Sequence, residues 1–446
     1  MKATFDKEFT SGLRRLAIPI IAQSLLSTAI GTADTLMLNA IGQTELSAVS
    51  LANNLSRILS NLFLGLIVGT SVLLAQYLSS AHREKINNVF SISCLVAGIA
   101  CSTFFLLATL APGFIMQLFT NDQALIRIGM QYLRIVGFSF LFMTFTQPYL
   151  VMLKAIRKPT KSMIISTTAL VINLIFNAVF IFGLFGAPKL GVRGVAIATV
   201  ISRAVEFILC LVDYVRCKYV HFATRAGKKI WNDFFRISIP QTTEGLMWIL
   251  AFSAMASIMG HINEDIVAAS TVSQSIYMIA RVASIGLADA GAILLGGDLG
   301  RQDFEKARAH ASQLTKIAIM AGAAGTVLML LAAWPVIHML RLTDRARQYL
   351  TFMFIMQAFN VIFAAITYEM LCGVFTAGGD TRFGMIADTI IMWVMVGLGF
   401  LTLKLGAAPL VVFFVMKLDE AVKTPVVLWR YKKEKWLRNI TEEQKS

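Results

Sequence analysis

Long apolar stretches recur along nearly the whole chain, and each can cross the hydrocarbon core of a membrane as an α-helix. About 20 apolar residues suffice for one crossing, because each helical residue advances the chain by about 1.5 Å. We therefore predict an all-α polytopic membrane protein with twelve transmembrane helices. By hydropathy, these helices cover 16–38, 48–78, 88–112, 126–152, 162–185, 193–215, 236–260, 266–297, 310–337, 349–374, 384–403 and 409–429.

The charge distribution gives these helices an orientation. Only 15% of the residues are charged, against about 25% in soluble proteins, and the net charge is +15. Most of the 40 Lys and Arg residues fall in loops on one side of the predicted membrane. The positive-inside rule then places both termini in the cytoplasm, with the Arg cluster at 341–347 as an exception. The basic excess reflects topology in the cell (cytoplasmic) membrane, so we expect no nucleic-acid partner.

The chain contains an internal repeat. A shift of 221 residues aligns RLAIPIIAQSLLS (15–27) with RISIPQTTEGLMW (236–248) and brings Pro19 onto Pro240. The register continues without a gap for about eighty residues and also pairs Gly65 with Gly286 and Lys85 with Lys306. We therefore predict two lobes of six helices each.

The lobes are expected at 1–218 and 219–446, the second with a basic cytoplasmic tail. Six crossings per half return the chain to its starting side, so the repeat is parallel and related by an axis along the membrane normal. Such a frame leaves a cavity between lobes that can open to either side. One chain supplies the complete pathway, so a monomer suffices and no protein partner is required.

Three segments resemble the multidrug and toxic-compound extrusion (MATE) family, most closely its bacterial members. They are IPIIAQSLLSTAIGTADTLMLNAIGQTELSAVSLAN (18–53), GLFGAPKLGVRGVAIATVISRAVE (183–206), and AGGDTRFGMIAD followed by LDEAVKTPVVLWRYKKEKWLRN (377–439). The resemblance implies a secondary active exporter that exchanges lipophilic organic compounds, often cationic, for H⁺ or Na⁺ by a rocker-switch movement. It implies the lipid bilayer and small organic cations or drugs as partners, and no cofactor beyond the coupling cation.

Asp34 is the first candidate for the coupling site. It lies in an otherwise apolar or small-residue segment, and a charge near the bilayer centre costs about 2.5–3.5 kcal/mol on insertion scales. Such a carboxylate either exchanges a proton or binds Na⁺ through oxygen ligands; the structural alternative is a solvated interfacial aspartate. The family resemblance adds a bend at Pro19 and polar partners on the fifth helix, matched by Asn173 and Asn177. These two asparagines lie one turn apart, which also suits plain interhelical hydrogen bonding.

Glu244 is the corresponding candidate in the second lobe, four residues after the helix-bending Pro240 and aligned with Gln23 by the repeat. Trp248 follows one turn later, and an anionic group beside an aromatic face suits a lipophilic cation. Asn53 and Gln274 also align across the repeat and are predicted to line the substrate cavity, although packing explains them equally well. No structural metal site is expected, beyond a possible Na⁺ near Asp34.

Several charged residues near helix ends are expected to form structural or gating ion pairs. Two pairs have the i, i+3 spacing of self-neutralised charges, and two acids lie near the loop that holds Asp380. These residues are Arg203 with Glu206, Lys417 with Glu420, and Glu369 and Asp388.

Other functions fit the sequence less well. All five histidines fall in loops or at helix ends, which disfavours intramembrane metal or acyl-transfer catalysis, so we expect no enzyme. The phosphate-binding pattern GxxxxGK[ST] of ATP-driven pumps is absent from the sequence. The alternative is a flippase for lipid-linked saccharides from a related transporter group, which requires several cationic residues facing a central cavity.

Overall fold

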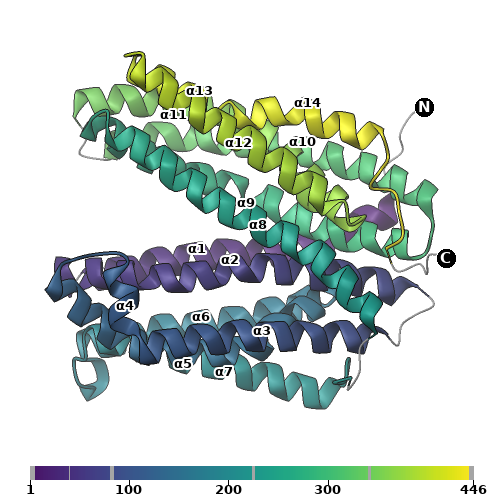
Figure 1. Cartoon of the computed structure of the whole chain (residues 1–446), viewed down its shortest axis with the longest axis horizontal. Helices are drawn as coiled ribbons and strands as arrows, with labels where there is room; N and C mark the ends of the chain where they lie inside the picture. The colour runs from purple at the N-terminus through teal and green to yellow at the C-terminus, as the bar shows by residue number, and fades with distance from the viewer. Residues whose placement is uncertain (1–5, 40, 81–84, 224–226, 340–342, 441–446) are drawn as a thin grey trace. The chain divides into compact units, whose positions relative to one another are not determined.

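The computed structural model describes residues 6–39, 41–80, 85–223, 227–339 and 343–440, and these residues are almost all helical (Figure 1). The first half contains α1 (Lys7–Asn39), α2 (Gln43–Ser79), α3 (Lys85–Leu110), α4 (Pro112–Gln117), α5 (Gln123–Ala155), α6 (Pro159–Phe182), the 3-10 turn η1 (Leu184–Gly186) and α7 (Val192–Cys217). The second half contains α8 (Lys228–Gly260), α9 (Glu264–Gly300), α10 (Phe304–Met339), α11 (Asp344–Tyr368), the π-helical segment η2 (Glu369–Phe375), α12 (Thr381–Lys404), α13 (Pro409–Met416) and α14 (Asp419–Lys432).

Eleven of the helical segments in the described residues are long and apolar enough to cross a membrane, which confirms the all-α polytopic fold. The twelfth predicted crossing, 409–429, is not one continuous helix. It divides into α13 and α14, with Lys417 and Leu418 between them. The break is stabilised from outside, because Asn360 Nδ2 donates to the main-chain oxygen of Lys417 at 3.1 Å. Irregular backbone at membrane depth requires such internal partners.

Helix bounds repeat with the same 221-residue shift that the sequence shows. Lys7–Asn39 becomes Lys228–Gly260, and Gln43–Ser79 becomes Glu264–Gly300, so α1 and α8 have 33 residues each and α2 and α9 have 37 each. Helices α6 and α12 also match, at 24 residues each. The duplication therefore extends to where helices begin and end.

The chain forms two compact units whose borders fall inside helices. Unit 1 consists of Met1–Ile21 and Ile239–Ser446, and unit 2 of Ala22–Ser238. The borders lie within α1 and α8, each within three residues of a proline, Pro19 or Pro240. The units thus differ from the predicted lobes 1–218 and 219–446 by an exchange of the first part of each leading helix.

Unit 2 is organised around α5, which packs against α2, α3 and α7. Tyr149 of α5 is fully buried and stacks on Phe145 with ring centroids 5.3 Å apart. Its hydroxyl donates to Asp213 Oδ2 at 2.8 Å, and Lys161 Nζ lies 2.5 Å from the other carboxylate oxygen. This ion pair joins α6 to α7 at the end where the sequence predicts the cytoplasm.

Unit 1 is organised around α11, which packs against α9, α10 and α14, and the chain after α14 folds back onto it. Arg438 donates to the main-chain oxygens of Gly378 and Gly379 at 2.8 and 2.6 Å, and Trp436 is buried. Only glycine fits at position 378, because a Cβ there would lie 1.7 Å from the Trp436 carbonyl oxygen. Two hydrogen bonds from Arg308 hold Glu434 and lower the pKa of its carboxyl.

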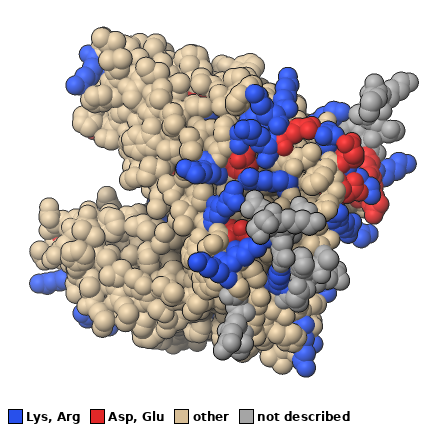
Figure 2. Space-filling view, turned by 45° about the vertical axis from the view of Figure 1, so that its right-hand side comes forward, with Lys and Arg blue, Asp and Glu red and all other residues tan. Residues whose placement is uncertain are grey.

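Wide areas of the molecular surface carry neither acidic nor basic side chains (Figure 2). Many large apolar side chains of both units are exposed, among them Ile99, Leu106 and Ile175 of unit 2 and Leu331 and Phe359 of unit 1. A water-soluble protein rarely exposes apolar patches of this extent. These surfaces are suited to contact lipid chains.

Candidate functional site

Three predicted coupling residues meet inside unit 2. Asn177 Nδ2 donates to Asp34 Oδ1 at 2.9 Å, and the same amide nitrogen lies 3.2 Å from Asn173 Oδ1. Asn177 is 2% exposed and Asn173 is 9% exposed, while Asp34 is half-buried. Helix α6 therefore presents Asn177 to the carboxylate on α1, and Asn173 is joined to that carboxylate through Asn177.

The spacing of the asparagines explains this arrangement. Residues four apart lie one above the other on the same face of an α-helix, so Asn173 and Asn177 form a short polar ladder in the otherwise apolar second half of α6. Asn177 Oδ1 is buried and has no hydrogen-bond partner among the described residues. Beside the Asp34 carboxylate, this open acceptor gives the cluster the oxygen-rich character that a proton or Na⁺ requires.

A second polar contact in unit 2 involves Asn53, which the repeat predicts to line the cavity. Its Oδ1 accepts a hydrogen bond of 3.0 Å from the hydroxyl of Tyr132, a buried residue of α5. The sequence reasoning did not identify Tyr132, since no motif or repeat singles this residue out in the sequence of α5. Gln23 is half-buried on α1.

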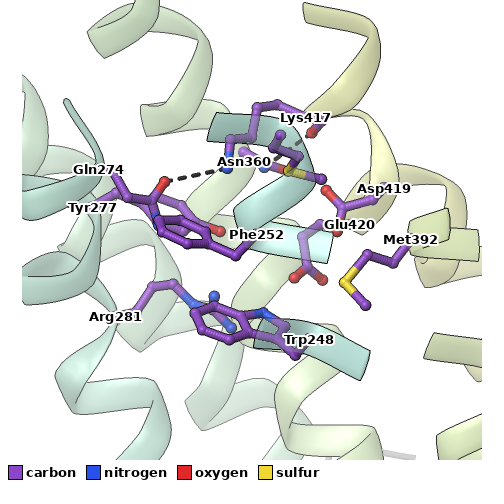
Figure 3. Close-up of a pocket in the computed structure, with 11 residues that line it drawn as sticks. Trp248, Phe252, Gln274, Tyr277, Arg281, Asn360, Met392, Lys417, Asp419 and Glu420 are labelled. Atoms are coloured by element: carbon purple, nitrogen blue, oxygen red, sulfur yellow. Dashed lines mark hydrogen bonds between the residues drawn. The ribbon is translucent and has the colours of Figure 1, made fainter. Parts of the chain in front are cut away.

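Unit 1 contains a cavity that combines aromatic and charged walls (Figure 3). Trp248 and Phe252 of α8 stack at 5.4 Å with an angle of 12° between the rings, and 40% and 39% of these residues are exposed. The predicted cavity residues Trp248 and Gln274 both line it, whereas Glu244 is not among its lining residues. The lining residues are Trp248, Phe252, Met255, Gln274, Tyr277, Arg281, Asn360, Met392, Lys417, Asp419 and Glu420.

Glu244 lies one helical turn from the cavity's tryptophan and has a partner on its own helix. Its Oε2 accepts a hydrogen bond of 2.9 Å from Gln241 Nε2. Asp388 of α12 and Lys423 of α14 both act on its carboxylate through space. The C-lobe candidate therefore belongs to a network of charges.

That network is centred on Lys423, which the sequence reasoning missed. Its ammonium lies 2.8 Å from Asp388 Oδ1, 3.0 Å from Asp419 Oδ2 and 3.4 Å from Glu420 Oε1, and the residue is 3% exposed. The spacing of DEAVK (419–423) contained the signal, because a lysine three and four residues after two acids faces both on a helix.

The expected pair of Lys417 with Glu420 is not formed. Lys417 Nζ donates instead to Gln274 Oε1 at 3.2 Å, and Glu420 bonds to Lys423 and accepts a hydrogen bond from Thr367. The break between α13 and α14 removes the continuous helix that i, i+3 pairing requires. Arg203 and Glu206, on the unbroken α7, do form their ion pair, with Nη1 and Oε2 2.7 Å apart.

Glu369 does not form an ion pair either, so the predicted structural or gating role as part of a pair is wrong. The residue is 0% exposed, and neither carboxylate oxygen has a hydrogen-bond partner among the described residues. Glycines provide the space, since a Cβ at Gly373 would lie 2.1 Å from its Oε1 and one at Gly291 3.2 Å. The neighbouring loop is held by Arg430 instead, which binds both Asp380 oxygens at 2.8 and 2.9 Å.

A helical membrane bundle with an internal repeat and with charged and polar clusters buried inside each unit is typical of secondary transporters. The family model MatE matches residues 19–179 and 240–401, one match in each repeat. The chain therefore belongs to the MATE family of efflux transporters.

Individual relatives agree with this assignment. The chain is 24% identical over 461 residues to the uncharacterized transporter YisQ of Bacillus subtilis, covering 98% of this chain and 97% of YisQ. It is 28% identical over 318 residues to the multidrug resistance protein NorM of Vibrio parahaemolyticus, covering 68% and 67% of the two chains. Crystallised MATE in the straight conformation superposes with a TM-score of 0.86 at 21% identity, covering 96% of each chain. An outward-facing MATE multidrug transporter gives 0.86 at 20%, covering 97% and 96%. The two structures show a shared fold.

Proposed function

We propose that the protein is a secondary active exporter of lipophilic organic compounds, driven by an inward gradient of H⁺ or Na⁺ that acts at Asp34. The observation that carries the proposal is the partly buried hydrogen bond between Asp34 and Asn177, which is joined in turn to Asn173. Relatives named as multidrug resistance proteins support the substrate class. The proposed location of the protein is the cell (cytoplasmic) membrane, with both termini in the cytoplasm.

Cation binding at Asp34 changes the hydrogen bonds that its carboxyl group and Asn177 can form with each other. A charged Asp34 accepts the hydrogen bond from Asn177 Nδ2. Once a proton occupies the carboxylate, Asp34 becomes a donor, and the open Oδ1 of Asn177 is the acceptor it needs. A bound Na⁺ would likewise require oxygens in place of the amide N–H. Hydrogen bonds to charged groups contribute about 1.5–3 kcal/mol, so this exchange is large enough to favour one arrangement of α1 against α6.

The two helices that carry the unit borders are suited to act as hinges. Pro19 in α1 and Pro240 in α8 lack an amide hydrogen and leave a carbonyl one turn earlier without its helical partner. Each proline lies within three residues of a border. Bending at these positions lets the two units change orientation without unfolding either, which supports the rocker-switch mechanism.

Export then follows from differential binding. Substrate enters from the cytoplasm or the inner leaflet, the external cation binds, and substrate is released outward. The cation drives transport only if it binds one conformation more tightly than the other. A single charge moving down a potential of 100 mV supplies about 2.3 kcal/mol, which is about a fiftyfold bias between two states.

The test is gradient-driven efflux from proteoliposomes, under separately imposed pH and Na⁺ gradients. Cationic ethidium and anionic fluorescein serve as substrates, so that the outcome does not depend on the charge of one dye. We expect the protein to export at least one dye under one gradient, and Asp34→Asn to reduce export to the rate of empty liposomes. The gradient that works identifies the ion.

Asp122→Asn is the matched control. Asp122 caps α5 by accepting from the amide nitrogens of Ala124 and Leu125, and asparagine caps helices equally well. We expect this loss of a carboxylate in the same unit to leave export unchanged. Equal export by Asp34→Asn and the unmodified protein contradicts the proposal. If the unmodified protein exports neither dye, the flippase function for lipid-linked saccharides becomes the better explanation.

A further inference from the structure

The acidic and basic side chains that line the cavity of unit 1 differ in how fully they are bonded (Figure 3). Asp419 and Glu420 both bond to Lys423, at 3.0 and 3.4 Å, and Glu420 also accepts from Thr367. Lys423, which is not a lining residue of the cavity, therefore offsets part of the negative charge of these carboxylates. A cationic ligand would have to compete with a buried lysine for them.

The two basic side chains have no comparable partner. Arg281 Nε is buried without a hydrogen-bond acceptor in the described part of the chain, and its guanidinium faces the rings of Tyr277 and Tyr368 at 5.2 and 5.7 Å. Lys417 Nζ donates to one neutral acceptor, Gln274 Oε1, although an ammonium has three donors. Asp419 and Glu420 act on both bases through space, but neither base forms an ion pair with any carboxylate of the described residues. The cavity therefore offers donors with unused bonding capacity beside carboxylates that already have partners.

Overall charge does not reverse this preference. Two acids, Asp419 and Glu420, and two bases, Arg281 and Lys417, line the cavity. The charges of Lys423, Asp388 and Glu244 belong to the network outside this lining. Because the lining charges are equal in number, the ligand's sign is decided by the groups it can bond directly. Those groups are the free donors of Arg281 and Lys417.

The remaining wall accepts a flat apolar group. Trp248 and Phe252 present stacked rings that are 40% and 39% exposed, and Met392 faces them across the cavity (Figure 3). Aromatic rings stack favourably on such surfaces, and thioethers adapt to varied shapes. An aromatic body and an acceptor group are thus the two parts that this cavity can bind together.

The geometry points to an amphipathic organic anion, an aromatic ring bearing a carboxylate or sulfonate, as the ligand of this cavity. The ring lies against Trp248 and Phe252, and the anionic group accepts from Arg281 and Lys417. This inference rests on the proposed export function and specifies its substrate class, in place of the organic cations that the family resemblance implies.

A matched pair of ligands tests it. Binding of 1-naphthalenesulfonate and 1-naphthylmethylammonium, which share a ring and differ in charge, is measured by equilibrium dialysis against the full chain in lipid nanodiscs. Empty nanodiscs provide the baseline. We expect the sulfonate to bind at least about tenfold more tightly than the ammonium. One charge-assisted hydrogen bond contributes enough free energy for a ratio of this size. An ammonium that binds as tightly as the sulfonate, or more tightly, overturns the inference.

Substitutions of the lining residues test which side chains cause the preference for the sulfonate. Arg281→Met and Lys417→Met should each reduce sulfonate affinity about tenfold, whereas Arg281→Lys and Lys417→Arg keep the charge and retain most of it. Trp248→Ala should weaken both ligands equally. Arg203→Met, which removes a base of unit 2 outside the cavity, should change neither. Unchanged sulfonate binding in both methionine variants, with unaltered thermal stability, rejects the site.

The binding assay is independent of ion-driven transport, so the two proposals fail separately. Sulfonate preference without gradient-driven export refutes the exporter function alone. Gradient-driven export of ethidium by a protein without sulfonate preference refutes this inference alone.

Discussion

Glu369 and Asp388 are both buried carboxylates of unit 1, and we predict opposite effects when each is replaced by an apolar residue. Glu369 is 0% exposed and has no partner for either oxygen among the described residues, whereas Asp388 Oδ1 lies 2.8 Å from Lys423. A buried polar group without a hydrogen bond costs about 1–3 kcal/mol. Methionine has a similar length and no such cost, so Glu369→Met should raise the free energy of unfolding by about 1–3 kcal/mol.

Asp388→Leu should destabilise, because it removes the shortest contact of a buried ammonium. Breaking a buried ion pair costs about 3–5 kcal/mol, and Lys423 keeps Asp419 and Glu420, so the lower end applies. In domains of 150–250 residues, 1 kcal/mol corresponds to about 2–4 °C in Tm. Glu369→Met should therefore raise Tm by several degrees, and Asp388→Leu should lower it by about 6–12 °C.

The measurement is thermal unfolding of the purified full-length chain in one detergent, followed by a thiol-reactive dye. Cys372, a partly buried residue of η2 in unit 1, reports unfolding of that unit by becoming fully accessible. Glu369→Gln is the control, since an amide of the same shape is equally unsatisfied and should leave Tm nearly unchanged. A lower Tm for Glu369→Met would show that the carboxyl has a stabilising partner and refute the reasoning.

Three further changes follow from contacts described above. Asn177→Leu removes the amide that bonds Asp34 and should reduce gradient-driven efflux at least tenfold, measured with the same dyes; unaltered efflux would exclude a role for the amide. Arg430→Gln leaves a buried carboxylate without its bidentate partner and should lower stability by about 3 kcal/mol in the thermal assay. Gly378→Ala should displace the segment around Trp436 and make it sensitive to limited proteolysis, whereas resistance equal to the unmodified protein would show that the loop adapts.

Much of this architecture is predictable from the sequence because lipid imposes a simple rule on each crossing. Helices must be about 20 apolar residues long, so hydropathy locates them, and the 221-residue shift predicts that α8 and α9 copy the bounds of α1 and α2. The meeting of Asp34 with Asn173 and Asn177 was expected from the family resemblance together with their helical spacing. Their role in coupling stays a prediction.

The remaining features depend on three-dimensional packing, which one-dimensional patterns do not contain. Lys417 was assigned to Glu420 by spacing along a helix, but the helix breaks after Met416, and the partner is Gln274, 143 residues earlier. Glu369 was expected to form an ion pair because it lies close to a loop, yet glycines of α9 and η2 allow it to be enclosed without one. The unit borders inside α1 and α8 are likewise invisible in hydropathy.

The discontinuity of unit 1 affects how the protein is made. Unit 2, Ala22–Ser238, is one unbroken stretch of chain, so all of it has been synthesised before most of unit 1 exists. The segment that ends at Ile21 leaves the ribosome first, yet the rest of its unit, Ile239–Ser446, is made last. At about 5–20 residues per second, that segment waits roughly 10–40 seconds for its packing partners. During this interval the translocation machinery or the lipid must cover the apolar side chains of the segment. Substitutions between Lys7 and Ile21 should therefore affect the yield of membrane insertion more than the stability of the finished protein.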